Sequence, residues 1–141
     1  MFRGFTVEHK VKVTEPAARA ESATASFLTL TGRTPDILPQ QARLADLTVV
    51  RHPNTPEEVS SSDVLHAVLF DSGRPLLIAP RVAPTTVGRR ICLGWNGSAE
   101  SAAAVEAAMP WLQRAEAVRI LWANEYQRRG PQAQELQTYL A

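Results

Sequence analysis

The sequence predicts an α/β fold with a mostly parallel sheet of five strands and helices on both faces. Two observations carry this prediction. Short apolar runs rich in β-branched residues alternate along the chain with segments whose apolar residues recur at helical spacing. Strands that alternate with helices are typical of βα units, whose strands lie parallel. The strands are expected at residues 24–31, 47–50, 76–79, 90–95 and 117–122.

Composition and charge indicate one ordinary globular domain. The 141 residues are 45% hydrophobic and 21% charged, and their net charge of +1 gives no basic bias toward nucleic acid. The apolar stretches are shorter than the roughly 20 residues that cross a membrane, and the N-terminus lacks the apolar core of a secretory signal. A single cysteine excludes an internal disulfide. We therefore expect a cytoplasmic protein without a membrane or nucleic-acid partner.

The N-terminal segment, residues 1–22, is the least defined part of the sequence. Apolar residues alternate weakly between Phe5 and Val13, but charged residues surround them. A strand here would lie at a sheet edge or be absent. Pro16 favours one or two helical turns after it. The first clear strand, 24–31, is rich in Thr, Phe and Leu and ends at Gly32.

The middle of the chain reads as helix, strand, loop, helix and strand. Thr34 is the expected cap of a helix that Pro35 opens. The strand 47–50 ends at Arg51-His52-Pro53, and a polar loop follows. Ser61, Ser62 or Asp63 should cap the next helix, which Gly73 ends before the strand 76–79.

Residues 89–112 form the best-defined stretch. The apolar run 91–95 is typical of a strand buried on both faces, and Asn96-Gly97 breaks it with residues that tolerate positive φ. Ser98 is placed to cap a helix that runs to Leu112. Free N–H groups at such a turn, together with the helix dipole, suit an anion. A strand at 117–122 and a helix from Ala133 complete the pattern.

From about Ala23 onward the chain resembles universal stress proteins, specifically the bacterial type with two units in tandem. Four segments in the family's order carry the resemblance: ARLADLTVV, LFDSGRPLLIAP, RRICLGWNGSAES and PWLQRAEAVRIL. The resemblance implies a Rossmann-like sheet. It also implies that residues 23–83 match the back half of one unit, strands three to five, and residues 84–141 the front half of the next, strands one and two.

This register predicts a permuted sheet. The family's sheet order is three-two-one-four-five, so the strand 90–95 should lie between 47–50 and 117–122. The residues between Pro80 and Gly88 could reach roughly 30 Å, enough to close the sheet within one chain. Two chains that exchange halves would make the same contacts, so a homodimer is expected as well. We expect the halves to pack as one domain in either case.

The family's nucleotide-binding elements are altered in this chain. An acidic residue at the end of strand one is replaced by Asn96, followed by Gly97 and Ser98. The glycine-rich loop after strand four is replaced by a segment that has no glycine before Gly73. Glu57 and Glu58 in that segment would repel an anion. Binding of ATP is therefore doubtful, and no cofactor is expected. A smaller anion could still bind Arg51, His52 and the 96–98 turn.

The remaining polar and aromatic residues give weaker signals. Cys92 is expected to be a buried small hydrophobe. His52 is the histidine nearest a predicted site, and no spacing resembles a metal centre. Trp95 and Trp122 are expected to pack in or around the core, and stacking on a base is the alternative.

Three functions stay open at this point. The first is a non-enzymatic, universal stress protein-like stress-response protein that binds partners or a small ligand. The second is an ATP- or AMP-binding module of the same family. The third is an enzyme related to the adenine-nucleotide α-hydrolases, which would need a glycine-serine-rich loop where WNGSAES has one glycine.

Overall fold

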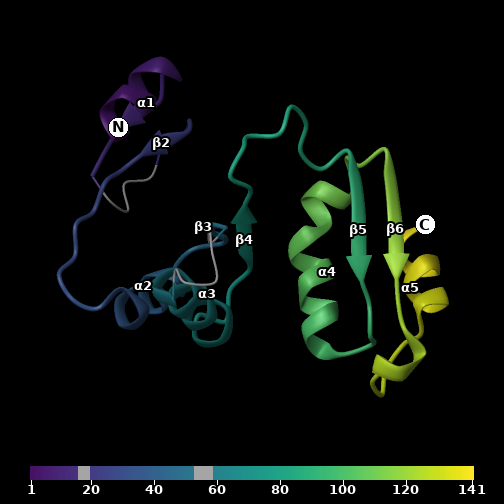
Figure 1. Ribbon diagram of the computed structural model, residues 1–141. Coiled ribbons are helices and arrows are strands. Elements are labelled where there is room, and N and C mark those ends of the chain that lie inside the picture. The colour runs from purple at the N-terminus through teal and green to yellow at the C-terminus, as the bar shows by residue number, and fades with distance from the viewer. Residues whose placement is uncertain (16–19, 53–58) are drawn as a thin grey trace.

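The computed structural model describes residues 1–15, 20–52 and 59–141 and has a mixed α/β fold (Figure 1). Its helices and strands alternate through most of the chain, as the sequence predicts. In chain order the elements are α1 Phe2–Glu8, β1 Lys12–Val13, β2 Thr24–Ala25, α2 Thr34–Ala42, β3 Thr48–Arg51, α3 Val59–Asp71, β4 Leu76–Ala79, β5 Arg90–Gly94, α4 Ala99–Leu112, β6 Ala117–Leu121, the 3₁₀ turn Asn124–Tyr126 and α5 Ala133–Leu140.

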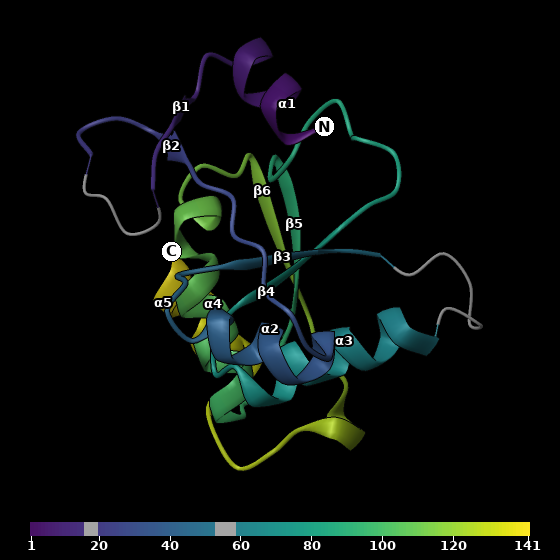
Figure 2. The same ribbon diagram turned by 90° about the vertical axis from the view of Figure 1, so that its left-hand side faces the viewer.

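The described strands form three separate two-stranded sheets, so the prediction of a single five-stranded sheet is wrong for this chain. The pairs are β1–β2, β3–β4 and β5–β6, and all three are parallel. Val49 pairs with Leu77 and Ile91 with Val118, so the strands expected to be neighbours at the sheet centre lie in different sheets. In Figure 2, β3 runs across the direction of β5 and β6. Two strands that are joined by one helix pair with each other. Pairing β3 with β5 would instead require residues 80–89 to turn back along the sheet.

The C-terminal unit, residues 90–140, contains the main core. Strands β5 and β6 are joined by α4, and α5 returns over them (Figure 1). Alternate residues of β5 point inward, because side chains of a strand alternate between its faces. The buried cluster consists of Leu93, Trp95, Val105, Leu112, Ala133 and Leu136.

The N-terminal unit, residues 34–79, is built from α2 and the β3–α3–β4 succession. Among the residues of this unit that the structure describes, the buried hydrophobic ones are Ala42 and Val68, of which Val68 is fully buried. Arg43 links the two helices, because its guanidinium donates from Nε and Nη2 to the carbonyl oxygen of Asp71 at 3.3 and 3.1 Å. Arg74 Nε donates in return to the carbonyl oxygen of Arg43 at 3.0 Å. Hydrogen bonds from arginine side chains to backbone carbonyls therefore supplement a small apolar core.

The N-terminal segment differs from its expected form. Residues 2–8 form a helix where the alternation pointed to an edge strand or no element, and Lys12–Val13 form a short strand. The predicted strand 24–31 is reduced to Thr24–Ala25, and Phe27 and Leu28 are exposed. The helical turns expected after Pro16 fall partly on residues 16–19, which lie outside the described residues.

Two helix starts also differ from their predictions. Helix α2 begins at Thr34 with Arg33 at the cap position and without a side-chain cap bond, so Thr34 is the first helical residue and not the cap. Helix α3 begins at Val59, before the expected caps Ser61, Ser62 and Asp63. Most of the polar loop predicted between β3 and α3 lies outside the described residues.

Cys92 is exposed, which corrects the expectation that it is buried. It lies on the face of β5 opposite to Leu93 and Trp95, and no helix covers that face in the described structure. The sequence indicated burial on both faces because the run 91–95 is apolar throughout. Only one of the two faces is packed.

Candidate functional site

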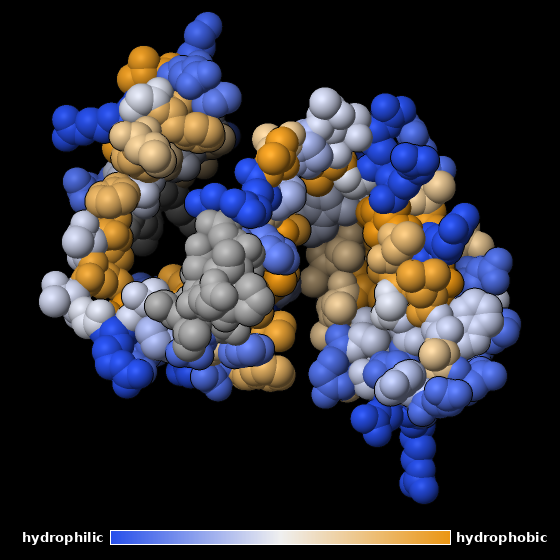
Figure 3. Space-filling model, in the orientation of Figure 1, coloured by the Kyte–Doolittle hydropathy of each residue, from blue (hydrophilic) through white to orange (hydrophobic). Residues whose placement is uncertain are grey.

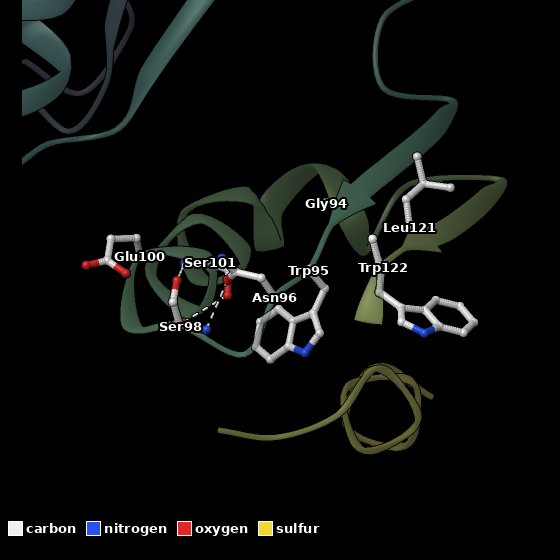
Figure 4. A pocket seen from close by; sticks show the side chains of 9 residues that line it. Gly94, Trp95, Asn96, Ser98, Glu100, Ser101, Leu121 and Trp122 are labelled. Atoms are coloured by element: carbon white, nitrogen blue, oxygen red, sulfur yellow. Dashed lines mark hydrogen bonds between the residues drawn. The ribbon is translucent and has the colours of Figure 1, made fainter. Parts of the chain in front are cut away.

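A hollow of about 620 Å³ opens where β5 and β6 end (Figure 4). In parallel sheets, ligands bind outside the carboxyl ends of the strands, so this is the place that the fold favours for a site. The hollow has a polar side, formed by the start of α4, and an apolar side, formed by the end of β6. Its lining residues are Gly94, Trp95, Asn96, Ser98, Glu100, Ser101, Leu121, Trp122 and Ala123.

The turn that precedes α4 is built as the sequence predicts. Ser98 is the N-cap, and its Oγ accepts a hydrogen bond from the backbone N–H of Ser101 at 3.2 Å. The Ser101 hydroxyl donates to the carbonyl oxygen of Ser98 at 2.9 Å. Asn96 Oδ1 accepts the backbone N–H of Ser98 at 3.1 Å. The predicted cap is confirmed, and two N–H groups that could have held an anion are bonded to the protein's own side chains.

Glu100 adds a negative charge to this polar side. The pKa of its carboxyl is lowered, first by a hydrogen bond from its own backbone N–H, then by one from the Ser98 side chain, and to a smaller extent by the charge of Arg128. Burial acts in the opposite direction and does not cancel these effects. Glu100 is therefore ionised at neutral pH. Its carboxylate uses a helix N-terminal N–H, which is the type of donor that a phosphate would need.

The two tryptophans of the hollow have different environments. Trp95 is buried in the core cluster, and its indole Nε1 donates to the carbonyl oxygen of Pro131 at 2.9 Å. Trp122 is 52% exposed and is not part of that cluster. In Figure 4 it lies on the side of the group opposite to Glu100. Trp122 is the aromatic surface available to a ligand, whereas Trp95 supports the site from beneath.

Gly97 fixes the turn against the loop 127–131. Its φ of +75° is in the left-handed region, and a Cβ there would overlap Gln127 Nε2 and lie 2.9 Å from the carbonyl oxygen of Pro131. The carbonyl oxygen of Asn96 accepts the backbone N–H of Arg128 at 2.7 Å. Glycine is therefore required at position 97 for two reasons: the left-handed backbone conformation and the close contact with the loop 127–131.

The structure brings together only part of the predicted ligand-binding set. Asn96 and Ser98 line the hollow, and Gly97 lies between them. Arg51 and His52 belong to the end of β3, in a different sheet, and neither lines the hollow. The backbone N–H of His52 donates to the carbonyl oxygen of Ala79 at 3.0 Å.

Three residues of the site were not singled out from the sequence. Glu100 and Ser101 follow the cap directly, so the segment SAES gave the available signal. Gln127 had none, because it reaches the turn from a loop 30 residues away in sequence. Its Oε1 is buried and has no hydrogen-bond partner.

Within the described part of the chain, no group of three or more His, Cys, Asp and Glu side chains is arranged to hold a metal ion. Of the helices in that same part, none has the length and apolar character to cross a membrane. Comparisons with protein-family models, curated proteins and solved structures gave no match to this chain.

Proposed function

We propose that the chain is a non-enzymatic, universal stress protein-like binding protein that acts in the cytoplasm. Its ligand site is the hollow at the ends of β5 and β6. The motif resemblance supports the family. The observation that supports the ligand class is the pairing of an ionised Glu100 with an exposed Trp122 across one hollow. A small ligand with a flat aromatic ring and no phosphate fits this pairing best.

The alternative of an ATP- or AMP-binding module is less well supported. A phosphate at the start of α4 would meet the Glu100 carboxylate, and the N–H groups of Ser98 and Ser101 already have acceptors. Arg51 and His52, the residues first considered for such a ligand, do not line the hollow. A phosphate would therefore replace existing bonds and approach a like charge.

The alternative of a hydrolase is less well supported as well. Among the residues that line the hollow, Glu100 is the only ionisable side chain. A serine nucleophile needs an adjacent base, and the hydroxyl of Ser101 instead donates to a backbone carbonyl. The arrangement supports binding without chemistry.

Equilibrium dialysis with adenosine, AMP and ATP tests the proposal. Each added phosphate should weaken binding, and a dissociation constant for ATP in the low micromolar range, about −8 kcal/mol, would overturn the proposal. Glu100→Gln should reduce the difference between adenosine and ATP. Glu106→Gln, which changes an exposed glutamate of the same helix outside the hollow, is the matched control and should leave the difference unchanged.

The aromatic contact has its own test. Trp122→Ala should weaken adenosine binding by about 1–3 kcal/mol if the indole stacks on the base. Tyr126→Ala removes another exposed aromatic side chain, 71% exposed and outside the hollow, and should have no effect. Equal adenosine affinities in the two variants would mean that adenosine does not bind in this hollow.

A further inference from the structure

The hydrogen-bond donors on the polar side of the hollow are mostly used by the protein itself. The Ser98 hydroxyl donates to the Glu100 carboxylate, and the Ser101 hydroxyl donates to the carbonyl oxygen of Ser98 at 2.9 Å. The backbone N–H groups of Ser98 and Ser101 donate to Asn96 Oδ1 and Ser98 Oγ. The N–H of Glu100 donates to its own carboxylate. The amide nitrogen of Asn96 is the one side-chain donor on this side that these bonds leave free.

Acceptor capacity, in contrast, remains at Glu100. An ionised carboxylate has about four lone pairs on its two oxygens, and the two bonds just described use part of them. Glu100 is also the one ionisable side chain among the residues that line the hollow. A ligand group that meets this side is therefore favoured if it donates hydrogen bonds and carries a positive charge.

Two positive charges near Glu100 compete with such a group. The start of α4 carries roughly half an elementary charge, which is less than the full negative charge of the carboxylate. Arg128 is exposed and does not line the hollow, and of the listed influences its charge has the smallest effect on the pKa of Glu100. Its backbone N–H donates to the carbonyl oxygen of Asn96 at 2.7 Å, so Arg128 lies beside the turn. Neither charge occupies the hollow itself.

The opposite side of the hollow offers an apolar surface. Leu121 and Trp122, at the end of β6, are each 52% exposed. Figure 4 shows Trp122 and Glu100 on opposite sides of the labelled group. On the visible face of the C-terminal unit, hydrophobic residues gather along the strands, and the end where β5 and β6 stop is more hydrophilic (Figure 3). A ligand that contacts both sides needs an apolar ring at one end and a polar group at the other.

We propose that the ligand of the hollow is an arylalkylamine, a flat aromatic ring joined by a flexible arm to a protonated amine. The ring packs on Trp122 and Leu121, and the ammonium group donates to the Glu100 carboxylate. The arm is needed because the ring and the charge are recognised on opposite sides of the hollow. This inference rests on the function proposed above and adds to it the positive charge of the ligand.

Three probes of matched shape test this charge: phenylethylamine, the neutral phenylethanol and the anionic phenylpropanoate. Calorimetric titration of the full chain at neutral pH and low ionic strength should give affinities that fall in that order. The amine should bind about threefold more tightly than the alcohol, because an ion pair with an exposed carboxylate contributes modestly. High salt should remove the preference, since it screens exposed charges.

Four variants assign the preference to residues. Glu100→Gln should abolish it, and Glu106→Gln, on the same helix and outside the hollow, should leave it unchanged. Arg128→Gln removes the competing cation and should strengthen binding of the amine, a change that damage to the fold would not produce. Trp122→Ala should weaken the amine and the alcohol by the same factor and so keep the preference.

The outcomes separate this inference from the function on which it rests. Equal affinities for the amine and the alcohol, or a preference that survives in Glu100→Gln, would overturn the arylalkylamine. So would weaker binding of the amine in Arg128→Gln. The aromatic site would still stand if adenosine binds and Trp122→Ala weakens that binding. Failure of adenosine and of all three probes to bind would overturn both.

Discussion

The chain contains two βαβ units of similar length, and they differ in the number of hydrophobic residues that they bury. β3–α3–β4 has strands of 4 residues and a helix of 13, and β5–α4–β6 has strands of 5 and a helix of 14. The second contains six buried hydrophobic residues in one cluster with α5, whereas the described part of the N-terminal unit buries Ala42 and Val68. Element length does not explain this difference.

The difference follows from what returns over the strands. In the C-terminal unit, α5 contributes Ala133 and Leu136 to the core, and Pro131 accepts the indole N–H of Trp95. In the N-terminal unit, α2 and α3 pack together and are linked through Arg43. A βαβ unit thus gains a core when another element covers its strands. The comparison predicts that substitutions matter more in the C-terminal unit.

The largest expected effect is from Trp95→Ala. It removes a buried indole together with its hydrogen bond and should lower the free energy of unfolding by about 3–5 kcal/mol. Val68→Ala in the N-terminal unit removes less volume and should cost about 2 kcal/mol. Urea unfolding of both variants checks this order, with the exposed Leu44→Ala as the neutral control. A larger loss for Val68→Ala would reverse the comparison.

The next effect compares two glycines in left-handed conformation. Gly97→Ala should cost about 2–3 kcal/mol, because strain at a φ of +75° adds to overlap with the 127–131 loop. Gly73 has a φ of +64° and nothing within 4 Å of an added Cβ. Gly73→Ala should therefore cost only the backbone term, about 1 kcal/mol. Equal thermal shifts in the two variants would mean that the turn and the loop do not touch.

A smaller effect is expected at the cap of α4. Ser98→Ala removes the acceptor for the Ser101 N–H and should cost about 1 kcal/mol. Ser98→Asp keeps an acceptor at the cap and should recover most of that loss. If chemical denaturation gives the same free energy of unfolding for Ser98→Ala and the wild type, the Ser98 side chain does not stabilise the start of α4.

The smallest effect is a pH dependence at Glu100. Because folding lowers the pKa of this carboxyl below its ordinary value of 4.5, the folded state binds its proton less readily than the unfolded state. The resulting stabilisation is present above pH 4.5 and is lost as the pH falls through the folded value. Melting temperatures of wild type and Glu100→Gln should therefore diverge above this range and converge below it. Parallel curves would contradict the assigned hydrogen bonds.

Local features of the chain were predictable from sequence, and long-range pairing was not. The Asn96-Gly97-Ser98 turn depends on residues within a few positions, and its cap and positive φ are confirmed. Strands near 47–50, 76–79, 90–95 and 117–122 are also confirmed within one or two residues. Ile91 of β5 pairs with Val118 of β6 and not with a residue of β3. Residue patterns do not show which of two possible partner strands pairs more favourably.

In the candidate site, too, local features were predictable from the sequence and long-range contacts were not. Its turn was found because every signal lies in one short segment, and Arg51 was grouped with it only through an assumed sheet order. The exposure of Cys92 had no local signal, since an apolar run looks the same whether one face or both are covered. Gln127 reaches Gly97 from a loop, and the sequence did not predict this contact.

The local pairing of the strands has a consequence for how the chain folds. Each main strand pair closes within a segment of the chain, 48–79 or 90–121, through one crossover helix. Contacts close in sequence form faster than contacts between distant segments of the chain. Refolding should therefore show a fast phase that gains most of the helix signal at any dilution.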